Sequence, residues 1–173
     1  MQTCSDSKIG LNFMTQKSNL AQTVGDLLKK EGLSFCAAES CTGGLLLSTL
    51  TDVSGSSAYV LGGVVTYSNE AKQHLVKVQA ETLIAHGAVS EQTAREMVIG
   101  VCDLFKADVG VSVTGIAGPG GATAEKPVGL VYVGVKVADT VVVREYNWQG
   151  NREENKDYSV VAALTLVQAM INP

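Results

Sequence analysis

The chain has few of the residues from which metal and redox sites are built. Its 173 residues include only two histidines and four cysteines, and no two cysteines form a Cys-x-x-Cys pattern. No recognisable metal-ligand spacing is therefore present, and we expect no metal ion at the functional site. We expect the cysteines to be reduced and partly to fill the core; they are Cys4, Cys36, Cys41 and Cys102.

Charged residues are also few, and neither acidic nor basic residues strongly predominate. Charged residues make up 17% of the chain and the net charge is −4. Wholesale nucleic-acid binding needs a basic surface, so we expect no nucleic-acid partner, although a small anionic ligand remains possible. No apolar run approaches the ~20 residues of a membrane helix, and residues 1–17 contain no run of signal-peptide length. The sequence predicts a soluble, cytoplasmic protein with no membrane partner.

What the chain does have is enough apolar sequence for a core of ordinary size. Hydrophobic residues make up 46% of it, which suits one domain, predicted over residues 18–173 after a poorly ordered N-terminal segment, 1–17. Periodicity and capping signals predict helices at 18–32, 44–50, 81–85, 90–104 and 151–171, with a short helix around Lys72. Strands are predicted at 34–38, 59–67, 108–114, 128–137 and 140–148, the last two as a hairpin.

Helices alternate with strands in the first two thirds of this pattern, and a strand pair and a helix close the chain. That order predicts an α/β fold of three layers, α/β/α, around a mixed sheet. One antiparallel strand is expected, and it comes from the hairpin.

Three small polar clusters recur between the apolar runs. They are residues 39–44 (ESCTGG), residues 55–57 (GSS) with 66–72 (TYSNEAK), and residues 114–121 (TGIAGPGG). Glycine lets a backbone approach a ligand closely, and neighbouring hydroxyls or a lysine can do chemistry. The first cluster follows a predicted strand and opens a helix, so it is either an anion site or an ordinary helix cap. The third is either a ligand-wrapping loop or a flexible connection.

The second cluster offers a serine and a lysine on either side of one predicted strand. A desolvated Lys72 could take the proton of Ser57, with Tyr67 relaying it or orienting the lysine. The alternative is an ordinary turn followed by a solvated lysine. Cys41 is a weaker candidate nucleophile because no histidine lies near it in the sequence.

Near the last predicted helix, Arg152 either grips a phosphate with two parallel hydrogen bonds or is a surface residue. Trp148 and the tyrosines show no stacking stripe in the sequence, which argues against a platform for single-stranded nucleic acid.

From about Leu20 to its end, the chain resembles the C-terminal domain of the CinA family. The resemblance rests on residues 38–44 (AESCTGG), 65–72 (VTYSNEAK), 86–90 (HGAVS) and 114–119 (TGIAGP). It implies a three-layer fold like the anticodon-binding domain. It also implies hydrolysis of nicotinamide mononucleotide to nicotinate mononucleotide and ammonia, within pyridine nucleotide recycling and without a cofactor. Longer CinA proteins carry a further N-terminal domain, and this chain is expected to hold only the deamidase-like part.

The same resemblance implies roles for individual residues. Ser57 would be the nucleophile, Lys72 its base and Tyr67 an assisting group. The substrate would be a small nucleotide, and the expected assembly is a homo-oligomer, most simply a dimer. The residues expected to bind the substrate are Ser40, Thr42, Gly43, Thr114, Gly115, Ala117, Gly118 and Arg152.

Three departures from the family pattern stand out, at four positions. Leu61 and Gly62 stand where Glu-Arg is frequent, Asn151 replaces an aspartate, and Lys156 stands where a second arginine is common. These changes leave a second hypothesis open, a catalytically silent nucleotide-binding or regulatory module of the same fold.

Overall fold

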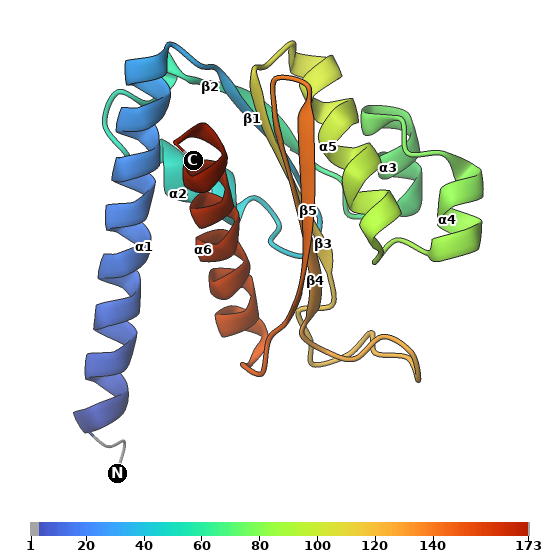
Figure 1. The fold of residues 1–173 in the computed structure, drawn as a ribbon. Helices are drawn as coiled ribbons and strands as arrows, with labels where there is room; N and C mark the ends of the chain where they lie inside the picture. The colour runs from blue at the N-terminus through green and yellow to red at the C-terminus, as the bar shows by residue number, and fades with distance from the viewer. Residues whose placement is uncertain (1–3, 173) are drawn as a thin grey trace.

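The computed structural model describes the backbone of residues 4–172 and the side chains of residues 15–172. Figure 1 shows these elements along the chain. Their bounds are α1 Cys4–Glu31, β1 Phe35–Glu39, α2 Leu45–Thr51, the 3-10 turn η1 Ser56–Ala58, β2 Val60–Val65, α3 Asn69–Val76, α4 Ala80–His86, α5 Glu91–Phe105, β3 Val109–Gly115, β4 Leu130–Val137, β5 Thr140–Asn147 and α6 Arg152–Ile171.

The five strands form one mixed sheet in the order β2-β1-β3-β4-β5. Strands β2, β1 and β3 are parallel, whereas β4 pairs antiparallel with both β3 and β5. The prediction of one antiparallel strand from the hairpin is therefore confirmed. Because β1, β2 and β3 run the same way, their carboxyl ends, Glu39, Val65 and Gly115, lie along one edge of the sheet.

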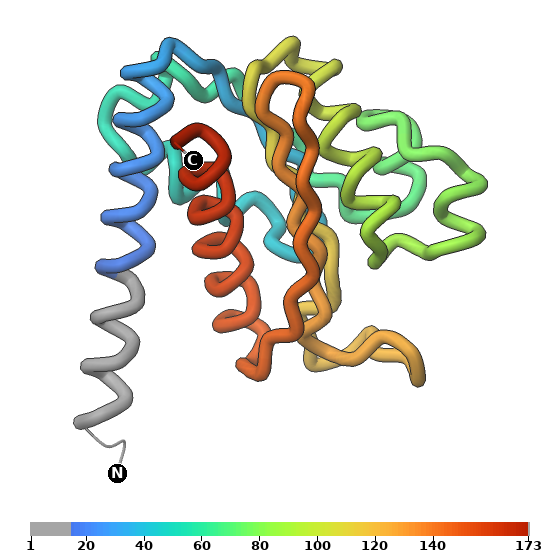
Figure 2. The backbone as a smooth tube through the Cα atoms, in the orientation of Figure 1, coloured from blue at the N-terminus to red at the C-terminus, as the bar shows by residue number. Residues whose placement is uncertain are grey.

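Helices cover both faces of the sheet, as predicted for three layers. Helices α1, α2 and α6 lie on one face, and α5 covers the other, with α3 and α4 outside it (Figure 1). The tube in Figure 2 shows the segment between β3 and β4 extending away from the sheet edge. That segment follows β3, at the edge where the parallel strands end.

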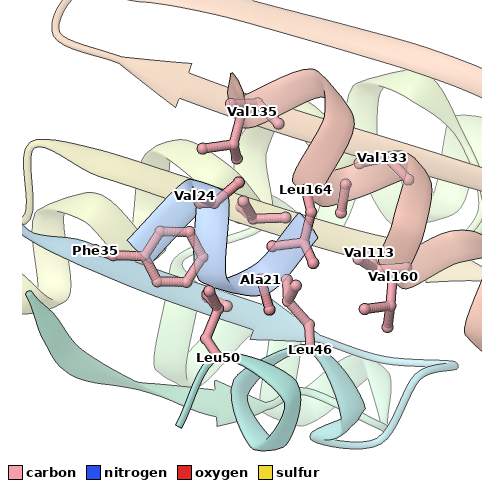
Figure 3. Packing of buried hydrophobic residues seen from close by; sticks show 14 of the residues in the cluster. Ala21, Val24, Phe35, Leu46, Leu50, Val113, Val133, Val135, Val160 and Leu164 are labelled. Carbon is pink, nitrogen blue, oxygen red and sulfur yellow. The ribbon is translucent and has the colours of Figure 1, made fainter. Parts of the chain in front are cut away.

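The larger apolar core lies between the sheet and the layer of α1, α2 and α6. Figure 3 shows Phe35 of β1 and Val113 of β3 facing Leu46 of α2 and Leu164 of α6. The inner strands β1 and β3 are buried along almost their whole length because both of their faces are covered. A smaller core under α5 contains Met97.

Helix α1 differs from its predicted form. It begins at Cys4, well before the predicted start at residue 18, so no helix boundary lies at residue 17. The predicted poorly ordered segment 1–17 falls partly outside the described residues. In no helix of residues 4–172 do the length and hydropathy needed to span a membrane coincide.

Three aromatic side chains meet although the sequence shows no stacking stripe. Trp148 stacks on Tyr146 with ring centroids 4.8 Å apart and lies 5.6 Å from the ring of Tyr158. Its indole N–H donates to the hydroxyl of Ser159 at 3.0 Å. Tyr146 and Trp148 pack against the larger core, so these rings join β5 to α6.

We predict that Gly100→Ala destabilises the protein, although alanine is the better helix former. A Cβ at Gly100 in α5 would lie 1.8 Å from the carbonyl oxygen of Val76 in α3, and relieving that overlap should cost about 2 kcal/mol. The matched control is Gly120→Ala, whose Cβ would meet nothing within 4 Å. Urea unfolding should separate the two variants. Equal stabilities would contradict close packing of α5 on α3.

Candidate active site

A pocket lies at the sheet edge where the parallel strands end. Its volume is about 240 Å³. Residues from five chain segments line it, which are those that follow β1 and β2, the end of β3 with the loop after it, the turn between α4 and α5, and the start of α6. The lining residues are Ser40, Cys41, Tyr67, Lys72, Ala88, Val89, Thr114, Gly115, Ile116, Ala117, Gly118, Gly120, Gly121 and Arg152.

The polar centre of the pocket is a contact between a lysine and a serine. Lys72 Nζ lies 3.1 Å from Ser40 Oγ and donates to the carbonyl oxygen of Thr66 at 2.7 Å. Ser68 caps α3 through the Ala71 N–H, and α3 then directs Lys72 back under the end of β2. The Lys72 side chain is 1% exposed and Ser40 is 8% exposed, so bulk water hardly reaches the contact.

Burial also sets the charge state that Lys72 prefers. Desolvation lowers the pKa of Lys72 from its ordinary value, and only the nearby Cys41 thiol acts in the opposite direction. Among the described side chains no carboxylate forms an ion pair with Lys72. A buried amine without a counter-ion favours its neutral form, which is the form able to accept a proton.

Ser40 is held in place by the strand ends around it. Its N–H donates to the carbonyl oxygen of Val113 in β3 at 2.8 Å, and the Thr66 N–H donates to the carbonyl oxygen of Glu39 at 2.8 Å. The serine and the lysine-binding carbonyl thus lie on neighbouring backbones joined by ladder hydrogen bonds. The separation of Ser40 and Lys72 is fixed by sheet pairing rather than by a flexible loop.

The residue before Ser40 is a buried acid that caps α2. The Glu39 carboxylate is 0% exposed and accepts from the N–H groups of Gly44, Leu46 and Leu47 at 3.0, 3.1 and 2.9 Å. These are the donors that a substrate anion would have used. Of the two sequence hypotheses for residues 39–44, the helix cap is the one the structure has, with Glu39 as the capping group.

The predicted contact between Ser57 and Lys72 is absent. Ser57 is an exposed residue of η1, before β2, whereas Lys72 follows the other end of that strand. Six strand residues at ~3.3 Å each separate these ends by roughly 20 Å. The prediction was wrong because α3 turns back toward the end of β1, where Ser40 lies, and not along β2.

The other predicted residues divide into two groups. Thr42 and Gly43 do not line the pocket: the Thr42 side chain is fully buried and Gly43 is exposed. Eight predicted residues do line it, namely Ser40, Tyr67, Lys72, Thr114, Gly115, Ala117, Gly118 and Arg152. The sequence assigned no pocket role to Ala88 or Val89, although both belong to the 86–90 motif.

Cys41 lines the pocket but is a poor nucleophile. Its side chain is buried, and desolvation raises the pKa of the thiol to about 12. The reactive form of cysteine is the thiolate, which is a minor species at neutral pH in this environment. The chemistry of the pocket therefore centres on Ser40.

One wall of the pocket is a loop fixed by side chains from distant elements. The hydroxyl of Thr114 donates to the carbonyl oxygen of Ala88 at 2.7 Å. Asn155 of α6, fully buried, donates to the carbonyl oxygens of Ala117 at 3.1 Å and Gly150 at 2.9 Å. Sequence analysis missed Asn155, since a single polar residue in a helix gives no local signal of such a contact.

Arg152, the first residue of α6, is exposed and lines the pocket. Its guanidinium donates to the carbonyl oxygen of Gly118 at 2.7 Å and to the Tyr67 hydroxyl at 3.3 Å. Two of its five N–H groups are thereby used, which leaves donors for a ligand. Tyr67 is 64% exposed, and its hydroxyl accepts this hydrogen bond from Arg152.

Metal-binding groups do not gather at the pocket. Across residues 15–172, histidine, cysteine and carboxylate side chains nowhere form a group of three that could hold a metal ion.

Comparison with known proteins identifies the family of this chain. The model of the CinA C-terminal domain matches residues 17–171. The chain belongs to the CinA C-terminal domain family. It is 47% identical over 167 residues to a CinA-like protein of Chloroherpeton thalassium, and 46% identical over 149 residues to a CinA-like protein of Chlorobium phaeobacteroides. These alignments cover 94% and 83% of this chain but only 40% and 35% of the relatives, so the chain spans about two fifths of their length.

Solved structures of CinA relatives have the same fold. The competence/damage inducible protein CihA from Agrobacterium tumefaciens is 42% identical, with a TM-score of 0.88 over 91% of this chain and 96% of that one. A CinA superfamily protein from Klebsiella pneumoniae is 32% identical, with a TM-score of 0.87 over 90% of this chain and 97% of that one. The predicted family and fold class are both confirmed.

Within this CinA domain, we predict that Glu39→Gln lowers the free energy of unfolding by roughly 2–4 kcal/mol. The amide keeps one acceptor oxygen but turns an NH₂ group toward buried N–H donors. The matched control is Glu31→Gln, at the exposed end of α1, which should change stability by less than about 0.5 kcal/mol. Thermal and urea unfolding give the comparison. Unchanged stability in Glu39→Gln would show that the carboxylate is not what caps α2.

Proposed function

We propose that this protein is an amidohydrolase that converts nicotinamide mononucleotide to nicotinate mononucleotide and ammonia. The observation that carries the proposal is the buried Lys72 amine, 3.1 Å from the Ser40 hydroxyl, inside a pocket. Membership of the CinA family supports the choice of substrate, because the family resemblance implies this reaction. The pair differs from the one predicted by sequence, since Ser40 takes the place of Ser57.

The chemistry follows from the contact between the two side chains. Ser40 Oγ attacks the carboxamide carbon while its proton passes to the neutral amine of Lys72. The resulting ammonium returns the proton to the leaving nitrogen, the C–N bond breaks, and ammonia departs. An ester between Ser40 and the pyridine carboxyl group remains. Water then attacks this ester, with Lys72 again accepting the proton, and releases the carboxylic acid and the free serine.

The departures at Leu61, Gly62 and Asn151 lie outside the pocket. Leu61 is 50% exposed on β2, and neither it nor Gly62 lines the pocket. Asn151 caps α6, with its side chain accepting from the N–H groups of Glu153 and Glu154. Asparagine caps a helix about as well as aspartate. The observations that favoured a catalytically silent module therefore bear less on the chemistry than the sequence suggested.

We predict that the purified protein releases ammonia from nicotinamide mononucleotide and that Ser40→Ala lowers kcat by at least about a thousandfold. The matched control is Ser57→Ala, which changes the other candidate serine at the far end of β2 and should keep near-normal turnover. A coupled ammonia assay measures both variants. Loss of turnover in Ser57→Ala with retention in Ser40→Ala would reverse the assignment, and no ammonia from the wild type would favour the silent module.

We predict that turnover rises with pH through an apparent pKa below the ordinary lysine value, because burial lowers the pKa of Lys72 and the neutral amine is the base. Lys72→Met should abolish turnover without unfolding the protein.

The same lysine should make stability depend on pH. The folded state binds the Lys72 proton less tightly than the unfolded state, so wild-type stability should increase as pH rises from the folded-state pKa of Lys72 to its unfolded-state pKa.

The stability measurement provides the control for the kinetic one. Lys72→Met lacks the titrating amine, so its stability should match or exceed that of the wild type near neutral pH. The difference should shrink as the pH approaches the ordinary lysine pKa. Turnover in Lys72→Met within tenfold of wild type would remove the lysine from the mechanism.

A further inference from the structure

A second cavity adjoins the active-site pocket on the other side of Arg152. Its volume is about 470 Å³, and it lies between α1, the start of α2 and the first turns of α6. Arg152 lines both cavities, so the two cavities meet at this residue. The lining residues are Lys17, Leu45, Arg152, Glu153, Lys156 and Asp157.

Two of the three cations on this cavity, Arg152 and Lys156, form no ion pair among the described side chains. Lys17 and Asp157 neutralise each other across α1 and α6, with Nζ 2.6 Å from the carboxylate oxygen. Glu153, the other acid, is exposed at the helix start. Lys156 is half-buried and forms no ion pair among the described side chains. One turn separates Lys156 from Arg152, so the two cations lie on the same side of α6.

The available hydrogen-bond donors in this cavity belong to side chains rather than to the end of the helix. The first N–H groups of α6 donate to the Asn151 side chain, and the Glu154 carboxylate accepts from the Asn151 N–H at 2.7 Å. Arg152 has unused N–H groups, and the Lys156 ammonium has three. Two neighbouring cations with free donors are suited to a phosphate.

The volume of the active-site pocket also indicates that a nucleotide needs further space. The active-site pocket holds about 240 Å³, below the ~300–1,000 Å³ typical of sites that enclose a whole ligand. A nucleotide whose amide reaches Ser40 therefore extends out of this pocket. The second cavity shares Arg152 with the pocket and offers space for the rest of such a molecule.

We propose that the cavity between α1 and α6 is an anion subsite, in which Lys156 and Arg152 bind the phosphate group of the substrate. This inference rests on the proposed function for the identity of the substrate. The cavity and the cations Arg152 and Lys156 stand independently of that function. The subsite assigns Lys156 to recognition of the phosphate and not to the chemical step.

The test measures binding, so it does not depend on turnover. In the Ser40→Ala background, dissociation constants are determined by calorimetry for nicotinamide mononucleotide and for nicotinamide riboside, which lacks the phosphate. Adding Lys156→Gln should weaken nucleotide binding by roughly tenfold, and by at least fivefold more than nucleoside binding. The matched control is Lys30→Gln, an exposed lysine on α1, which should leave both constants unchanged.

Inorganic pyrophosphate is the second probe, and it contains no amide. It should bind the wild type in competition with the nucleotide and bind Lys156→Gln more weakly, with a smaller dependence on salt. The subsite would be overturned, even if ammonia is released, by either of two results. One is that Lys156→Gln weakens nucleotide and nucleoside binding equally, and the other is that it leaves the affinity for pyrophosphate unchanged. A protein that releases no ammonia but shows the Lys156-dependent preference would retain the subsite and lose the proposed reaction.

Discussion

The buried Lys72 amine joins two strand ends that would otherwise be connected only by backbone pairing. Its Nζ donates to the Thr66 carbonyl after β2 and contacts the Ser40 hydroxyl after β1. The parallel pairing of β1 and β2 places these two groups side by side, with Glu39 opposite Val65 in the register. A change in that register would separate the serine from the lysine. The geometry of the site is thus a consequence of sheet topology.

At the same edge of the sheet, the groups that carry positive charge have separate partners. The N-terminus of α2 carries partial positive charge, but the Glu39 carboxylate occupies its donors. That capping holds the turn containing Ser40 rigid and leaves little field for a substrate anion. Positive charge reaches the pocket from Arg152 instead, a side chain at the start of α6. The group that positions the turn of Ser40, Glu39, is therefore different from the group that supplies positive charge for a ligand, Arg152.

Most elements could be predicted from sequence because their signals are local. Helices α5 and α6 begin within a residue of the predicted positions 90 and 151, at the caps Ser90 and Asn151, and each observed strand overlaps a predicted one. The partner of Lys72 was not predictable in the same way, because proximity along the chain favoured Ser57. The decisive fact is that Ser40 and Lys72 follow parallel strands, whose carboxyl ends meet. Strand order is a property of the whole sheet. Asn155 was missed because its contact with Ala117 also joins elements that are far apart in the sequence.

Burial of Lys72 lowers the stability of the protein but keeps the amine able to act as a base. Burying an amine without a carboxylate costs free energy, and an apolar side chain of similar length would avoid that cost. An acid near Lys72 would also relieve it, but it would hold the lysine protonated and unable to accept the serine proton. The surrounding groups instead supply a carbonyl oxygen and a hydroxyl, which solvate a neutral amine without fixing its charge. A site of this composition is best explained by a requirement for a basic lysine, because stability alone would favour removing it.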